Sequence, residues 1–131
     1  MDGPFTNPMT GEKYIDPHQP GVKLDAGKVR GQLVLGGFAR ALWEVCKVGT
    51  FGAQKYTPNG WKLLEIERIE DAKVRHWLQD GMGLELDEET EYLHAAHEAW
   101  GALARLDALC RKREQRVKDT LMEQVPEQKA R

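Results

Sequence analysis

The stretch EYLHAAHEAWGALARLDAL, Glu91–Leu109, decides the fold. Its apolar residues recur at spacings of three and four, which is the periodicity of one buried face of an α-helix. These residues are Leu93, Ala96, Trp100 and Leu103. Upstream, Asp87 is a good N-cap, and the acidic residues after it suit the positive end of the helix dipole. The sequence therefore predicts a long helix that begins after Asp87 and continues past Leu109 into a charged, solvated extension.

Two further helices are predicted upstream of this stretch. The first spans residues 31–48, although Gly36 and Gly37 weaken its first half, and the second spans residues 63–79 before the stop signal DGMG. Their apolar residues are Val34, Phe38, Ala41, Leu42 and Val45 on the first helix and Ile66, Ile69, Val74 and Trp77 on the second. The intervening segment TFGAQKYTPNGWK predicts a structured loop, because Gly52 and the turn PNG interrupt a helix.

The remaining segments set the domain organisation. Residues 1–30 hold four of the six prolines, which argues against regular structure and predicts an irregular arm. Residues 31–121 are expected to form the helical domain, and residues 122–131 a flexible tail. Since no strand-like alternation of useful length occurs, the predicted fold class is all-α.

Composition limits the class of protein. The 131 residues suffice for one domain with one core. A net charge of −2 gives no reason to expect a nucleic-acid partner, and no run approaches the roughly 20 apolar residues that cross a membrane. The N-terminus also lacks the features of a signal peptide, so we expect a cytoplasmic protein without a membrane partner. Cys46 and Cys110 lack the spacing of a zinc site and are expected to be buried free thiols.

Three of the four histidines occur in two short helical segments. At 100° per residue, His94 and His97 lie about 60° apart on one helix and can point to the same place. On the preceding helix, His76 and Asp80 are one turn apart beside the apolar face, and Glu44 lies at the edge of the apolar face of the first helix. Three helices thus each offer ionisable groups at a core boundary, an arrangement that helical bundles use for metal and substrate sites.

A structural interpretation of the same residues stays open. A histidine at a helix boundary is more often hydrogen-bonded or exposed than a ligand. The H-E-x-x-H motif of zinc proteases is absent, and HAAHE places its glutamate wrongly for that mechanism. Lys55 and Trp61 fit ordinary surface and core positions equally well. The residues alone therefore do not decide between a metal site and helix packing.

Four segments resemble a known family in order and spacing. They are DAGKVRGQLVL, LWEVCKVGTFGAQKYTPNGW, VRHWLQDG and LDEETEYLHAAHEAW. From about Lys23 to Asp107 the chain resembles the phage and bacterial dATP/dGTP diphosphohydrolases, which are similar to the MazG-like all-α nucleoside triphosphate pyrophosphohydrolases. It also resembles the phage MazZ enzymes, which hydrolyse dGTP to dGMP in pathways that replace adenine with 2-aminoadenine. The resemblance implies a MazG-like helical bundle.

The resemblance also implies roles for individual residues. The positions that match metal ligands are Glu44, His76, Asp87, His94 and His97. Glu44 and Glu89 are candidates to take the proton of the attacking water, and Asp87 and Glu89 either complete the metal shell or cap the helix. Basic positions suited to phosphate oxygens are Lys28, Arg30, Lys55 and Arg75. Asn59 and Trp61 match an element that would contact or wall the base.

Three acidic positions sit less well in the family pattern. MazG-like enzymes characteristically carry E-x-x-E and E-x-x-D motifs, whereas histidines dominate the matching positions here. A literal E-x-x-E occurs at Glu67 and Glu70, outside the frame anchored on His76, and leaves Glu70 as a reserve ligand. Asp107 matches a late acidic position that is either functional or beyond the packed region.

The implied activity is hydrolysis of purine (deoxy)nucleoside triphosphates, dGTP first and dATP second, to the monophosphate and pyrophosphate. Mg²⁺ or Mn²⁺ would be the cofactor, with Mn²⁺ or another transition metal favoured by imidazole ligands. Wide apolar faces on a small chain predict a homo-oligomer, a dimer or tetramer. Two other functions stay open. One is a metal phosphohydrolase that releases phosphate or triphosphate, and the other is a non-enzymatic helical interaction module.

Overall fold

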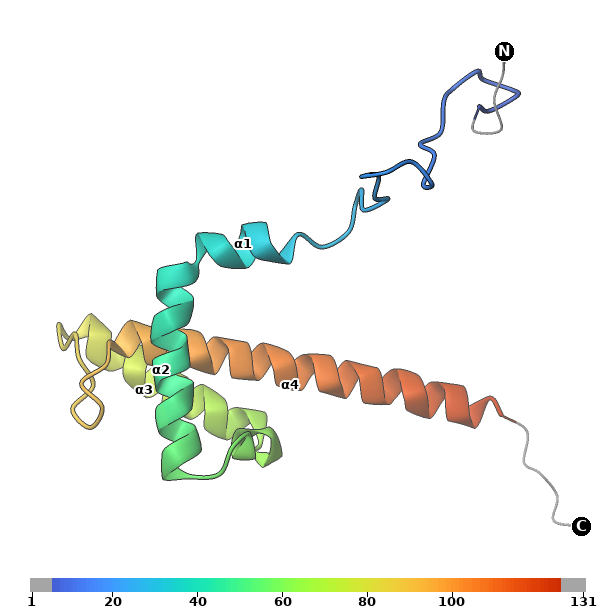
Figure 1. The fold of residues 1–131 in the computed structure, drawn as a ribbon. Helices are drawn as coiled ribbons and strands as arrows, with labels where there is room; N and C mark the ends of the chain where they lie inside the picture. The colour runs from blue at the N-terminus through green and yellow to red at the C-terminus, as the bar shows by residue number, and fades with distance from the viewer. Residues whose placement is uncertain (1–5, 126–131) are drawn as a thin grey trace, which may run out of the picture. The chain divides into compact units, whose positions relative to one another are not determined.

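A computed structural model of the chain describes residues 6–125. Its helices are α1 (Gly31–Gly37), α2 (Ala39–Lys55), the 3-10 helix η1 (Gly60–Leu63), α3 (Ile66–Gly81) and α4 (His94–Glu123) (Figure 1). Extended pairing within the described range is limited to two isolated bridges, Thr6 with Lys13 and Leu86 with Leu93. The predicted all-α fold class is confirmed.

The chain divides after Gly36 into two compact units. In the first, residues 6–30 form turns and bends, in keeping with their proline content. Asn7 stabilises one of these turns, because its side chain accepts a hydrogen bond from the Met9 N–H at 2.9 Å. Short-range hydrogen bonds of this kind replace a helix ladder, and α1 follows them. Residues 126–131 of the expected tail lie outside the described range, and α4 includes its first two residues.

In the second unit, α4 packs along α3 and crosses α2, with η1 also against α4 (Figure 1). The buried residues on α4 beyond its first turn are small, namely Gly101, Ala104 and Ala108. Small side chains let helix axes approach closely. At Gly101 a Cβ atom would lie 3.1 Å from Cβ of Lys73 on α3, tighter than ordinary van der Waals contact. This seam, with Ile69 of α3 and Val48 of α2, forms the core.

The predicted apolar faces differ from the observed core. Ala96 is buried as predicted, but Leu103 is 48% exposed and Trp77 on α3 is 62% exposed. The reason is that the close α3–α4 approach selects residues by size, so the small residues turn inward and several large ones stay outside. Cys46 and Cys110 are free as predicted but exposed, not buried. Each lies two positions, or about 200°, from a buried residue of its own helix.

Three predicted boundaries are also corrected. The first helix breaks at Phe38, beside Gly36 and Gly37, and then continues to Lys55, so half of the expected loop is helical. The long helix begins at His94, not after Asp87. Residues 82–93 instead form a loop in which Glu91 adopts a left-handed conformation with φ of 61°, which an α-helix cannot contain.

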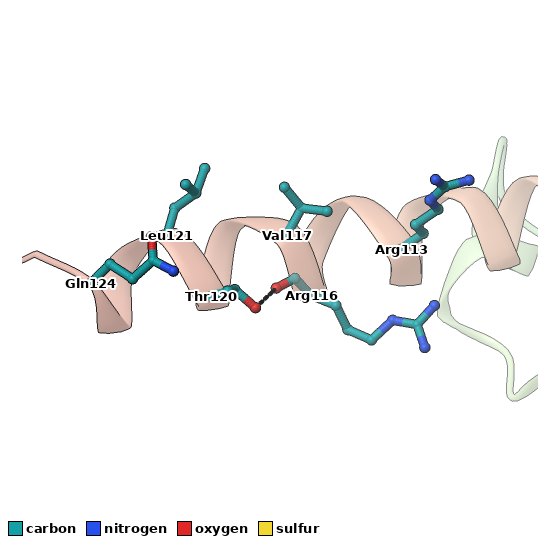
Figure 2. A pocket seen from close by; sticks show the side chains of 6 residues that line it. All are labelled: Arg113, Arg116, Val117, Thr120, Leu121 and Gln124. Atoms are coloured by element: carbon teal, nitrogen blue, oxygen red, sulfur yellow. Dashed lines mark hydrogen bonds between the residues drawn. The ribbon is translucent and has the colours of Figure 1, made fainter.

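The second half of α4 presents apolar side chains to solvent. Val117 is 54% exposed and Leu121 is 58% exposed. Figure 2 shows both on the same side of the helix, whereas Arg116 points to the other side. Within the described range, no helix combines the length and apolarity needed to cross a membrane. Val117 and Leu121 thus form an apolar patch that is exposed to solvent.

Candidate metal centre

A short loop brings an acidic residue next to the predicted histidines. His76 lies on α3, and His94 and His97 lie in the first turn of α4. The loop before α4 folds back on itself, since the Asp87 N–H donates to the Tyr92 carbonyl at 2.7 Å and the His94 N–H donates to the Glu85 carbonyl at 2.9 Å. These bonds fix the carboxylate of Asp87 beside the start of α4.

His76, Asp87 and His94 form the candidate metal centre. One ligand atom from each of the three residues lies within 4.8 Å of the others. The two Nδ1 atoms of His76 and His94 are 2.8 Å apart, and Oδ1 of Asp87 is 3.9 Å from Nδ1 of His76. His94 is only 2% exposed, so its ring is shielded from bulk water by the surrounding residues. Three donors thus converge from α3, the loop and α4.

His97, also predicted as a metal ligand, lies beside this group. Its ring stacks on that of His76, with centroids 4.2 Å apart and planes 8° from parallel. Its Nε2 atom lies 3.8 Å from Oδ2 of Asp87 and 2.8 Å from the hydroxyl of Thr90. The Tyr92 ring stacks at 6.4 Å on the same side chain. His97 therefore contacts both His76 and Asp87, the two half-buried donors.

The surroundings favour the protonation states that bind metals. Burial, followed by the neighbouring His97, lowers the pKa of His76 from 6.5 to about 4. Burial also lowers the pKa of His97. Burial would raise the pKa of Asp87, but hydrogen bonds from Thr90 and the nearby histidines hold it below its ordinary value. At neutral pH the His76 and His97 rings are neutral and the carboxylate is ionised, as metal ligation requires.

The donor set fits a divalent cation. Metal–ligand bonds of about 2.0–2.2 Å place neighbouring donor atoms roughly 3 Å apart, and the histidine nitrogens already meet this spacing at 2.8 Å. Oδ1 of Asp87, at 3.9 Å from Nδ1 of His76, would have to move closer to reach the same spacing. Two imidazoles and one carboxylate suit Mn²⁺ or another first-row transition ion better than Mg²⁺, which prefers oxygen donors.

The shifted pKa of His76 has a measurable consequence. We expect the metal-free chain to lose about 2 kcal/mol of unfolding free energy between pH 7 and pH 5. Because the folded-state pKa of His76 is about 4 and its ordinary value is 6.5, the unfolded state takes up the proton first. The stabilisation is complete above pH 6.5 and is lost as the pH falls toward 4. Urea unfolding with a chelator present measures it, and His76→Gln should flatten the dependence.

The predicted carboxylates Glu44 and Glu89 are engaged in ion pairs. Glu44, on α2, pairs with Lys47 at 3.0 Å, and the Lys47 ammonium lies 4.9 Å from the centre of the Tyr92 ring. Glu89 accepts a 2.6 Å hydrogen bond from Lys55, which joins the end of α2 to the loop. Among the described residues, neither glutamate forms a hydrogen bond or an ion pair with the three histidines. Neither glutamate belongs to the group of three possible metal ligands, His76, Asp87 and His94.

The predicted substrate-binding residues occupy several places. Arg75 is exposed on α3 next to His76, and Asn59 is exposed in the turn before η1 with φ of 58°. Trp61 packs edge-to-face on Trp100 of α4, with ring centroids 5.7 Å apart. Lys28 and Arg30 are exposed and belong to the first unit.

The two remaining acidic candidates form ion pairs elsewhere. Glu70, the reserve ligand, lies 3.1 Å from Lys73 and 3.3 Å from Arg105. Asp107 pairs with Arg111 at 2.8 Å on the exposed side of α4. Both carboxylates thus have cationic neighbours of their own.

Sequence reasoning missed Thr90 and Tyr92, which line the centre from the loop. Asp87 and Thr90 are three residues apart, and the Asp87 carboxylate accepts hydrogen bonds from both the N–H and the hydroxyl of Thr90 at 2.9 Å. This spacing is visible in the sequence. Asp87 by itself predicts a helix N-cap, because a carboxylate caps a turn and a helix by the same hydrogen bond.

The sequence of this chain is similar to those of known proteins. A dATP/dGTP diphosphohydrolase of Salmonella phage PMBT28 is 40% identical over 83 residues, which are 63% of this chain and 28% of that protein. The chain therefore spans little more than a quarter of the length of this relative. No solved structure matches. Residues 18–118, which include all the histidines and Asp87, match the family described as dATP/dGTP diphosphohydrolase, N-terminal. The chain belongs to this family.

Proposed function

We propose that this chain hydrolyses purine deoxynucleoside triphosphates in a metal-dependent reaction, with dGTP as first substrate and dATP as second, and releases the monophosphate and pyrophosphate. Family membership and the name of the phage relative support the substrate class. The observation that carries the proposal is the convergence of His76, Asp87 and His94. The match covers only 28% of the length of the phage relative. The proposal therefore includes the claim that the 131-residue chain is active by itself.

The chemistry needs a cation that the chain can hold and groups that bind a polyphosphate. A bound Mn²⁺ or Mg²⁺ would neutralise phosphate charge and lower the pKa of the attacking water. His76, Asp87 and His94 would hold it. Arg75, next to the centre in sequence, and Lys55, held near the loop by Glu89, would bind phosphate oxygens.

A nearby carboxylate would take the proton from the water. Glu44 and Glu89 are the candidates; Glu44 pairs with Lys47 on α2, and Glu89, in the loop before α4, pairs with Lys55. Movement of Lys55 toward a phosphate would break its ion pair with Glu89 and free the Glu89 carboxylate to accept a hydrogen bond from the water. In this proposal, substrate binding and base activation are therefore linked through one ion pair.

The centre is proposed to work in a homo-oligomer, a dimer or a tetramer. The support is the exposed apolar surface of the second unit, which includes Trp77, Leu103, Val117 and Leu121.

The resemblance to MazZ enzymes supports a further proposal, that the activity serves a phage pathway in which 2-aminoadenine replaces adenine. Formation of dGMP from dGTP would be its step in that pathway.

Product identification tests the proposed function. The purified chain is incubated with each dNTP and NTP in Mn²⁺ or Mg²⁺, and the products are separated by ion-pair chromatography. We expect monophosphate and pyrophosphate from dGTP and dATP, and no reaction with a chelator. Release of phosphate or triphosphate would indicate a different metal phosphohydrolase. No turnover of any nucleotide would contradict the proposal and favour a helical interaction module.

A further inference from the structure

Thr90 lies between Asp87 of the candidate metal centre and the neighbouring His97. Its hydroxyl oxygen lies 2.9 Å from Oδ2 of Asp87 and 2.8 Å from Nε2 of His97. Its backbone N–H also donates to Oδ2 of Asp87 at 2.9 Å. The side chain is half-buried, so the two side-chain contacts are shielded from competing water. Within the described part of the chain, Thr90 is thus the one residue of the acidic loop that forms a hydrogen bond with the side chain of His97.

Counting protons fixes the direction of both side-chain bonds. A threonine hydroxyl carries a single hydrogen, and an ionised carboxylate accepts hydrogen bonds but cannot donate them. The hydroxyl must therefore donate to Oδ2 of Asp87. Its oxygen is then the acceptor toward His97, so Nε2 of His97 carries the ring proton and Nδ1 is bare.

The hydrogen bonds from Thr90 give the two carboxylate oxygens of Asp87 different surroundings. Oδ2 receives two hydrogen bonds from Thr90, whereas Oδ1 is turned toward Nδ1 of His76 at 3.9 Å. Among the described residues, Oδ1, the oxygen nearer His76, receives no hydrogen bond. Since the His97 ring stacks on His76, fixing His97 also restrains the plane of the His76 ring.

We propose that Thr90 is a positioning residue of the candidate metal centre, whose hydroxyl selects the Nε2–H form of His97 and presents Oδ1 of Asp87 to a divalent cation. The cation rests on the proposed function, but the tautomer and the carboxylate orientation belong to the metal-free chain. A hydrogen-bonded partner behind a metal ligand typically changes metal affinity by 10–100-fold.

The test compares Thr90→Val, which removes only the hydroxyl, with Thr90→Ser, which keeps it. Both retain the backbone N–H that closes the turn, and circular dichroism checks the fold. Thr120→Val is the matched control, because the Thr120 hydroxyl donates to the Arg116 carbonyl on α4, away from the centre (Figure 2). The first readout is ¹⁵N NMR of the His97 ring in the metal-free full chain. The second is Mn²⁺ affinity by calorimetry.

We expect one protonated Nε2 signal for His97 in the wild type, Thr90→Ser and Thr120→Val, and a mixture of tautomers in Thr90→Val. Mn²⁺ affinity should fall about tenfold or more in Thr90→Val alone. An unchanged tautomer and affinity in Thr90→Val would overturn the proposal, as would an equal loss in Thr90→Ser. If the wild type bound no Mn²⁺, the proposed function would fail, while the tautomer measurement would still decide the role of Thr90.

Discussion

We expect His94→Ala to lower kcat/KM for dGTP by at least about a hundredfold, because even partners behind metal ligands contribute 10–100-fold. Its Nδ1 atom lies 2.8 Å from that of His76, and the ring is 2% exposed. Alanine would remove one of the three donors and leave His76 without its hydrogen-bonded neighbour. Steady-state kinetics in Mn²⁺, together with the rise in melting temperature on adding Mn²⁺, measure the effect.

The control for this variant is His18→Ala, which removes an exposed histidine of the first unit. It should keep wild-type kinetics and the full Mn²⁺-dependent rise in melting temperature. His94→Ala also leaves a small cavity, so its chelated form should melt lower than the wild type. Loss of activity with the metal response intact would show that the variant acts through packing, and full activity would remove His94 from the centre.

The shared face of His94 and His97 could be predicted because it depends on local periodicity. Helical spacing places His94 and His97 on one face whatever the exact start of the helix. His76 lies on the neighbouring helix near its end, and a short connection brings these two helices together. In the structure the His76 ring contacts both of the other rings. Helical periodicity could place His94 and His97 on one face, whereas their grouping with His76 was implied by the family resemblance and not by local sequence.

The loop before α4 could not be predicted in the same way. Asp87 followed by two glutamates is a good helix start by composition, yet the chain turns at Thr90 and extends again to Leu93. The choice depends on a bridge between Leu86 and Leu93 and on the left-handed backbone of Glu91. A pattern typical of a helix start records neither the bridge nor the left-handed residue. Because residues 82–93 form a loop, Asp87 lies in the candidate metal centre and not at the start of a helix.

Side-chain size explains the error in the predicted core. Hydrophobicity alone favours Leu103 and Trp77 as buried residues, but the seam between α3 and α4 is closed by Gly101, Ala104 and Ala108. Close packing of two helices requires small residues at the crossing, and large apolar residues then point outward. A single sequence does not reveal how closely two helices approach. The outward apolar residues are what an oligomer would cover.

We expect Asp87→Asn to weaken Mn²⁺ binding by about a hundredfold and to lower kcat/KM for dGTP to a similar degree. The variant separates the two roles of Asp87. An asparagine oxygen still accepts the hydrogen bonds from Thr90, so the turn and the fold should persist. The negative charge that faces His76 is lost, however, and a neutral amide oxygen is a much poorer ligand for a divalent cation. Calorimetric titration with Mn²⁺ and steady-state kinetics measure both effects.

Glu88→Gln is the matched control, because it removes the same charge from an exposed position in the same loop. It should leave both Mn²⁺ affinity and kcat/KM within about twofold of the wild type, since an exposed charge contributes little. Equal losses in the two variants would mean that the loop acts through its general negative charge. Wild-type Mn²⁺ affinity in Asp87→Asn would mean that the carboxylate only closes the turn, and the centre would then depend on the histidines for its cation.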